Sequence, residues 1–294
     1  MKTPSIIMHI MYCECDAMNE WDIYNHYEYK KFKNKYFPGI FGLDYILKEI
    51  FAIYAFTQMN KIKQKNNFIT NKQALNMIFY GNPGTGKTTI ARNVAKMFCD
   101  INYLSKGHLV EIDRSDLIGE YIGQTTIKTK KILETAKGGV LFIDEAYSLY
   151  NEDYNDFGNE AIDIILKFVE DHHEDFIVIL AGYKEKIELM LHNNKGLNSR
   201  FPIKLFYQDY NVDELKQIFR YTIKKHGYEV SKGLEQKFSQ YLSKLAQENN
   251  PLLKYNGRFI RNLIEKIIRN HDLKLFLSKN LSNNIMILDE DDFR

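Results

Sequence analysis

The stretch Gly81-Asn82-Pro83-Gly84-Thr85-Gly86-Lys87-Thr88 decides the fold of this 294-residue chain. It matches the P-loop pattern, and it lies between an apolar run at residues 75–80 and a helical pattern at about 87–99. The glycines allow successive backbone N–H groups to point inward, and the helix N-terminus adds its positive dipole end. We therefore predict a nucleotide-phosphate site in which Lys87 contacts the β and γ phosphates and the Thr88 hydroxyl binds Mg²⁺.

Two carboxylates follow another buried strand further along the chain. Residues 140–143 are all apolar, and Asp144 and Glu145 come directly after them. In a parallel sheet, the carboxyl edge of the strands carries the ligand site. Asp144 can hold Mg²⁺ through water, and Glu145 can orient the attacking water or accept its proton. Acids are common at solvated strand ends, so it is the upstream P-loop that favours the catalytic interpretation.

Strand and helix patterns alternate over the first two-thirds of the chain. Apolar runs at 75–80, 108–113, 140–144, 176–181 and 203–206 predict five strands, separated by helical patterns. Such alternation indicates an α/β fold with a parallel sheet covered on both faces. After residue 208 the patterns are mainly helical, at about 211–226, 233–247 and 257–277, with one strand near 284–288. We predict an N-terminal appendage of unknown role at 1–37, a nucleotide-binding domain at 38–208 and a small helical lid domain at 209–294.

Composition narrows the function classes. The chain is 45% hydrophobic and 27% charged, which is typical of a globular protein, and no apolar run approaches the roughly 20 residues of a membrane helix. Forty basic against 38 acidic residues argues against a large basic surface for nucleic acid or lipid. The three cysteines cannot all pair, which suggests a reducing compartment. The N-terminus does not resemble an export signal, so we expect a cytoplasmic protein without membrane contact.

The P-loop and the Asp-Glu strand end together resemble the AAA+ ATPases. Residues 119–125, 138–147, 156–163 and 179–183 are similar to the group that contains stage V sporulation protein K and the red-type Rubisco activases. The resemblance covers about residues 41–277, and residues 73–75, 104–109 and 256–259 look more like the sporulation branch. It implies Mg-dependent ATP hydrolysis, a hexameric ring with ATP at subunit interfaces, and mechanical remodelling of a protein client.

The resemblance also assigns roles to two arginines. Arg200 falls in the arginine-finger segment and would reach the γ-phosphate in a neighbouring subunit, although Lys195 stands where the family has a proline. Arg258 matches the sensor-2 arginine, with Arg261 one helical turn further on as the alternative. Glu145 and Arg200 are thus the predicted catalytic residues. The predicted nucleotide-binding residues are Gly81, Asn82, Pro83, Gly84, Thr85, Gly86, Lys87, Thr88, Thr89, Asp144 and Arg258.

Three further segments are interpreted through the family. Tyr121, Ile122 and Gly123 fall where AAA+ rings carry a pore loop, in which an aromatic ring grips a peptide; the alternative is a buried turn tyrosine. Residues 41–43 resemble the segment that lines the adenine pocket. Tyr183 replaces the asparagine that many members use as sensor 1, and the sequence does not tell whether it senses nucleotide or only packs.

Four functions remain open at this point. A sporulation-type remodelling ATPase is favoured, and a red-type Rubisco activase shares the same motor. A nucleotide-switched scaffold is disfavoured by the intact Asp144-Glu145 pair. A nucleic-acid loader is disfavoured by the near-neutral charge and by the lack of an aromatic and basic stacking surface. The identity of the client protein cannot be read from the sequence.

Overall fold

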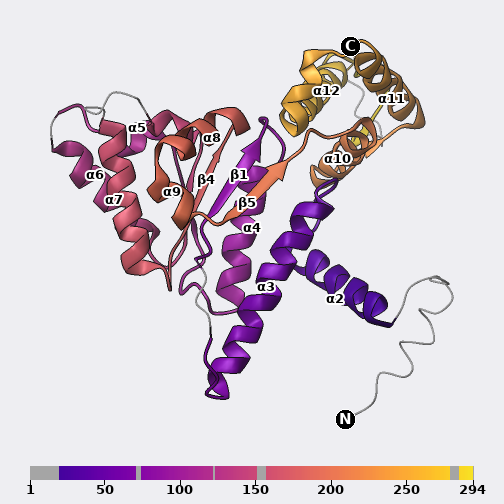
Figure 1. The fold of residues 1–294 in the computed structure, drawn as a ribbon. Helices are drawn as coiled ribbons and strands as arrows, with labels where there is room; N and C mark the ends of the chain where they lie inside the picture. The colour runs from indigo at the N-terminus through magenta and orange to yellow at the C-terminus, as the bar shows by residue number, and fades with distance from the viewer. Residues whose placement is uncertain (1–19, 71–73, 122, 151–156, 279–284, 294) are drawn as a thin grey trace.

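A parallel sheet of five strands organises the nucleotide-binding half of the protein (Figure 1). The computed structural model describes residues 20–70, 74–121, 123–150, 157–278 and 285–293. The strand order is β2-β3-β4-β1-β5, and all neighbours run parallel. Each predicted strand lies within two residues of an observed one, which confirms the α/β prediction. The strands are β1 (Met77–Gly81), β2 (Leu109–Ile112), β3 (Val140–Ile143), β4 (Ile177–Gly182) and β5 (Ile203–Tyr207).

Helices cover both faces of this sheet. Because side chains alternate along a strand, Met77 and Phe79 of β1 face one layer while Ile78 and Tyr80 face the other. The first layer contains α2 (Glu20–Tyr36), α3 (Asp44–Lys65) and α4 (Lys87–Asp100). The second contains α5 (Arg114–Leu117), α6 (Gln124–Ala136), α7 (Phe157–His172), α8 (Lys184–Asn193) and α9 (Lys195–Arg200). Burial on both faces explains why the central strands are apolar throughout.

Helix α2 belongs to the N-terminal segment for which the sequence predicted no structure. Its Phe32 is 4% exposed and packs among aromatic rings of α3, with ring centroids 5.1 Å from both Phe51 and Tyr54. Phe37, directly after the helix, is fully buried. The described part of the segment thus adds to the core of the nucleotide-binding half. The spacing of Phe32 and Tyr36 was a helical signal, but the surrounding lysines obscured it.

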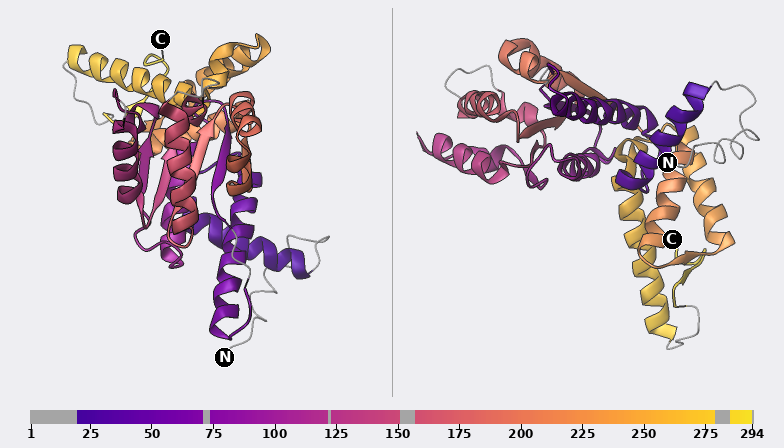
Figure 2. Two further views of the ribbon diagram at one scale, coloured as in Figure 1. Left: turned by 60° about the vertical axis from the view of Figure 1, so that its left-hand side comes forward. Right: turned by 90° about the horizontal axis from the view of Figure 1, so that it is seen from below.

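The C-terminal part forms a separate helical body beside the sheet, at the upper right of Figure 1 and again distinct in both views of Figure 2. It contains α10 (Val212–Lys225), α11 (Lys232–Gln247), the short η2 (Pro251–Tyr255) and α12 (Asn256–Ser278). A capping box of Asn211 and Glu214 starts α10, with backbone-to-side-chain distances of 2.9 and 2.8 Å. The predicted final strand, β7 (Ile287–Leu288), pairs with the unpredicted β6 (Glu229–Val230), which is too short to give a pattern.

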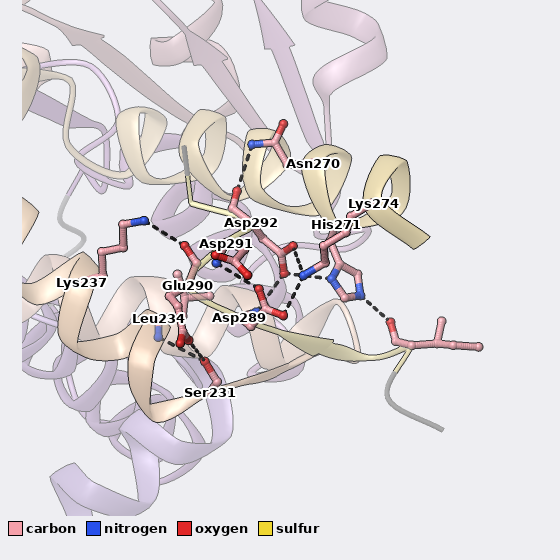
Figure 3. Close-up of polar contacts among 11 residues, drawn as sticks. Ser231, Leu234, Lys237, Asn270, His271, Lys274, Asp289, Glu290, Asp291 and Asp292 are labelled. Atoms are coloured by element: carbon pink, nitrogen blue, oxygen red, sulfur yellow. Dashed lines mark hydrogen bonds and ion pairs between the residues drawn. The ribbon is translucent and has the colours of Figure 1, made fainter. Parts of the chain in front are cut away.

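A buried polar cluster fastens the C-terminal segment to α12 (Figure 3). The Asp292 carboxylate is fully buried; its Oδ2 lies 2.9 Å from His271 Nδ1, and its Oδ1 lies 2.7 Å from Lys274 Nζ. His271 Nε2 lies 2.9 Å from the carbonyl oxygen of Ile285. Both ring nitrogens of His271 thus lie at hydrogen-bond distance from oxygen atoms of the C-terminal segment. Asp292 therefore connects two side chains of α12, His271 and Lys274, to the segment that carries β7.

We expect Asp292→Ala to destabilise the lid strongly. Removal of the buried carboxylate leaves His271 Nδ1 and the backbone N–H of Asp289 without their acceptor, whereas Lys274 keeps its pair with Asp289, so the cost should be about 1–3 kcal/mol. Asp213→Ala is the matched control, because that carboxylate is 84% exposed and its loss should change stability by no more than about 0.5 kcal/mol. Thermal unfolding of both variants measures the difference. Equal melting temperatures would show that the cluster does not hold the C-terminal segment.

Candidate active site

The P-loop opens into a cavity of about 1230 Å³ between the sheet edge and the helical body. It lies between β1 and α4, whereas Asp144 and Glu145 follow β3. Strand β4 separates β1 from β3, so the end of β4 brings Tyr183 between the P-loop and the two carboxylates. The predicted site residues that line this cavity are Gly81, Pro83, Gly84, Gly86, Lys87, Thr88, Thr89, Asp144, Glu145 and Arg258.

Two P-loop glycines have conformations that other residues rarely adopt. Gly86 has φ +95° and forms the left-handed N-cap of α4. Gly84 has φ +76°, and a Cβ there would lie 2.3 Å from the carbonyl oxygen of Tyr255. Gly84 is thus required by its backbone conformation and by the close approach of the segment before α12.

The Lys87 ammonium group lies against the loop that it follows. Its Nζ donates to the carbonyl oxygens of Gly81 at 2.7 Å and of Asn82 at 2.8 Å. Burial lowers the pKa of Lys87 to about 8, and the carboxylate of Asp144 opposes this shift. The side chain is therefore positioned for an anion and becomes deprotonated only slightly above neutral pH.

We expect ATP affinity to fall as pH rises above about 8. Phosphate favours the charged ammonium, so above the pKa of Lys87 binding must take up a proton, and the Kd rises by up to about tenfold per pH unit. Below that pH the ammonium is already charged and this dependence disappears. Titrations with a fluorescent ATP analogue from pH 7 to 9 test the expectation. Lys87→Arg is the control, because its guanidinium stays protonated and its profile should be flat; an equal slope in both proteins would implicate another group.

Glu145 is exposed toward the cavity and has an unusual backbone. Its φ of +47° is uncommon for a residue with a side chain, and its N–H donates to Asp144 Oδ1 at 3.0 Å. Tyr147 follows closely, and burial together with the Glu145 carboxylate raises the pKa of its phenol to about 12. The Tyr147 and Tyr183 rings lie 6.0 Å apart between centroids, and Lys186 Nζ lies 4.5 Å from the Tyr147 centroid. Glu145 thus lies beside a pair of tyrosines.

Aromatic and apolar side chains also line the cavity. Phe41, from the segment expected at the adenine pocket, lines the cavity, whereas Leu43 of the same segment is buried in the core. Tyr221 of α10 meets Phe41 edge to face, with ring centroids 5.6 Å apart. Tyr221 could not be predicted from the sequence, because a tyrosine on an amphipathic helix carries no signal of its own.

The oxygen groups present fit a magnesium ion. Thr88 and Asp144 line the same cavity beside Lys87, and hydroxyl and carboxylate oxygens are ligands that Mg²⁺ accepts. Among the described residues, no group of three or more His, Cys, Asp or Glu side chains is arranged to hold a metal.

Arg200 lies at the amino end of the parallel strands, opposite the end that carries the P-loop. It precedes β5, and its carbonyl oxygen accepts from the side chain of Asn76, which precedes β1, at 3.0 Å. The five residues of β1 therefore separate it from the P-loop by roughly 16 Å. Its guanidinium pairs with Glu170 of α7 and donates to the carbonyl oxygen of Gly196 at 3.2 Å. The sheet does not bring Arg200 into the cavity of its own chain.

The described residues of the predicted pore loop, Tyr121 and Gly123, lie between α5 and α6. Tyr121 is 67% exposed, which is inconsistent with a buried structural tyrosine. The base of the turn is held by the Thr125 hydroxyl, which accepts from Gly119 N at 3.1 Å, and by the Gln124 side chain, which accepts from Glu120 N at 3.2 Å. Ile122 lies outside the described residues, and Gly123 has φ +85°.

A P-loop, an Asp-Glu pair on the same sheet edge and a helical lid over the cavity define an ATPase of the AAA+ class. Residues 77–208 match the family described as "ATPase family associated with various cellular activities (AAA)", and residues 211–294 match the AAA lid domain. The chain belongs to the AAA ATPase family. Arg258 and Arg261 of its lid both line the cavity. No helix in the described ranges has the length and apolarity needed to cross a membrane.

The similar proteins fall in the group expected from the sequence. Stage V sporulation protein K of Bacillus subtilis is 42% identical over 88% of this chain and 80% of its own length. The chloroplastic ribulose bisphosphate carboxylase/oxygenase activase of Cyanidioschyzon merolae is 38% identical over 77% of each chain. A mutant of Thermotoga maritima RuvB superposes with a TM-score of 0.56 at 18% identity, covering 86% of this chain and 69% of that one, which shows the fold alone.

Proposed function

We propose that the protein acts as a hexameric ring in which ATP hydrolysis at subunit interfaces remodels a protein client. The position of Arg200 carries this proposal, because a catalytic arginine at the edge opposite the P-loop can serve only the site of a neighbouring subunit. The division into a nucleotide-binding domain at 38–208 and a lid at 209–294 belongs to the same proposal. We also propose that nucleic acid is not a substrate, because the net charge of the chain is close to neutral.

In the proposed mechanism, the P-loop backbone and the N-terminus of α4 bind the phosphates together with Lys87. Thr88 and Asp144 would hold a magnesium ion, which neutralises developing charge on the phosphate oxygens when bound. Glu145 orients the attacking water and accepts its proton, and Tyr183 borders that water. Arg258 contacts the phosphates from the lid. The remaining predicted ligands, Asn82, Thr85 and Thr89, belong to the loop and the first turn of α4.

The client-directed part of the proposal rests on the exposed ring of Tyr121, which precedes α6. An aromatic ring on a turn can grip a polypeptide without reading its sequence, and the fixed base of the turn would transmit movement of the subunit. The 42% identity with stage V sporulation protein K favours a sporulation-type role. The 38% identity with a Rubisco activase keeps that function as a second candidate. Reactivation of sugar-phosphate-inhibited Rubisco by the purified protein with ATP separates the two.

Two measurements test the proposed ring and its action on a client. Analytical ultracentrifugation of the Glu145→Gln variant with ATP should give the mass of six subunits, because ATP that is bound but not hydrolysed keeps the interfaces closed. Phosphate release by the wild-type protein should increase when an unfolded polypeptide such as casein is added. A monomer under all nucleotide conditions would contradict the proposal.

We expect Tyr121→Ala to abolish the stimulation of ATP turnover by casein while it retains most of the basal turnover. The ring makes the contact, so Tyr121→Phe should keep the stimulation. Because Tyr121 is 67% exposed, neither variant should shift the melting temperature beyond what about 0.5 kcal/mol produces. Phosphate-release assays beside melting curves measure both effects. A large drop in melting temperature with parallel loss of turnover would instead assign Tyr121 to the core.

A further inference from the structure

Four successive P-loop residues are each hydrogen-bonded to the lid or to the linker that leads into it. These contacts reach the loop from two places that are far apart in the sequence, the linker at 209–210 and the start of α12. They are Asn82 Nδ2 to Asp209 Oδ1 at 2.9 Å, Asn256 Nδ2 to the Pro83 oxygen at 3.3 Å, Gly257 N to the Gly84 oxygen at 3.0 Å, and the Tyr210 hydroxyl to the Thr85 oxygen at 3.0 Å.

Asn256 is the centre of this arrangement. It is fully buried, and its Oδ1 accepts from Tyr210 N at 2.8 Å while its Nδ2 donates to Asp209 Oδ1 at 2.7 Å. Its backbone has φ +52° and ψ −131°, a region that is nearly restricted to glycine. Such a conformation persists only where the surrounding contacts determine it, so the amide contacts of Asn256 hold the first residue of α12 in place.

The Asp209 carboxylate joins the two sides. Asn82 Nδ2 lies 2.9 Å from each of its oxygens, and Asn256 Nδ2 shares Oδ1. One anionic group thus accepts from the P-loop and from the lid together, and hydrogen bonds to an ionised acceptor are the stronger ones. Arg258 stands two residues after Asn256, and its backbone N lies against Gly84.

We propose that Asp209 and Asn256 are positioning residues: they clasp the start of α12 onto the P-loop and thereby place Arg258 over the phosphates. The second half of this statement rests on the proposed phosphate contact of Arg258. The clasp makes nucleotide affinity depend on a contact between lid and loop that touches no part of ATP. It also couples the conformation of the loop to the position of the lid.

An exchange of the two side chains tests the clasp. Asn256→Asp puts two carboxylates against each other, and Asp209→Asn removes the shared anionic acceptor; each should raise the Kd for ATP by about ten- to a hundredfold. The double variant Asp209→Asn/Asn256→Asp again places one donor against one carboxylate but does not restore the hydrogen bond to the Pro83 oxygen, so its Kd should lie clearly below the product of the two single effects without reaching the wild-type value. If the two effects simply multiply in the double variant, the side chains do not act as a pair and the proposal is wrong.

Three comparisons separate positioning from general damage. Asn250→Asp adds the same charge in the lid, where its side-chain oxygen still caps the backbone N–H of Leu252, and should bind ATP as wild type does.

Asn256→Gly permits the unusual backbone conformation but lacks the amide, so it should bind ATP as weakly as Asn256→Ala. Recovery of ATP affinity in the glycine variant would mean that only the backbone conformation matters. On an Arg258→Ala background, Asn256→Asp should weaken binding by less than it does alone, and a full additional effect would refute action through Arg258.

Lys87→Ala distinguishes this inference from the proposed site itself. It should abolish ATP binding while the protein still folds cooperatively without nucleotide, as a melting curve shows. ATP binding that survives in Lys87→Ala would contradict the site assignment. Loss of binding in Lys87→Ala with wild-type affinity in Asn256→Asp would contradict the clasp alone.

Discussion

Replacement of Arg200 by alanine is expected to lower ATP turnover by about 10³–10⁵-fold, the effect typical of an arginine finger, while ATP binding is kept. The guanidinium lies at the sheet edge opposite the P-loop, so its loss leaves every ligand of the bound nucleotide in the same chain intact. Turnover is measured by steady-state phosphate release and binding by nucleotide titration. Arg220→Ala is the matched control, because that arginine pairs with Glu235 on the lid surface and lies outside the cavity.

A mixture of subunits tells whether Arg200 acts on a neighbour. Lys87→Ala subunits lack a working P-loop but keep Arg200, and Arg200→Ala subunits have the reverse defect. Mixed rings contain some interfaces with an intact P-loop and an intact arginine, so the mixture should hydrolyse ATP faster than either variant alone. If both variants assemble together and no activity returns, the site is not shared between subunits.

Glu145→Gln should reduce hydrolysis by about 10²–10⁴-fold and leave ATP binding near the wild-type level. The amide has the same shape but cannot accept the proton of the attacking water. Glutamine also tolerates the φ of +47° about as well as glutamate does, so the strand end should keep its conformation. Glu134→Gln, on the exposed face of α6, provides the control with the same chemical change. Single-turnover phosphate release measures the step directly, and unchanged turnover would assign the water to another group.

The features that the sequence predicted are those encoded locally. The P-loop and the Asp144-Glu145 strand end are continuous motifs, and strands buried on both faces appear as unbroken apolar runs. The contacts that were not predicted join distant positions. Nothing near Asn256 indicates that it meets Pro83, and nothing in α10 indicates that Tyr221 meets Phe41. Only the packing of the lid on the sheet edge brings these residues together.

The opposite placement of Arg200 and the P-loop has a consequence for assays. If two chains must meet to complete one site, specific activity depends on the protein's own concentration. On dilution below the dissociation constant of the ring, the rate per chain should fall toward zero instead of staying constant. A rate plotted against total protein should therefore curve upward before it becomes linear, and the position of that bend measures the strength of assembly.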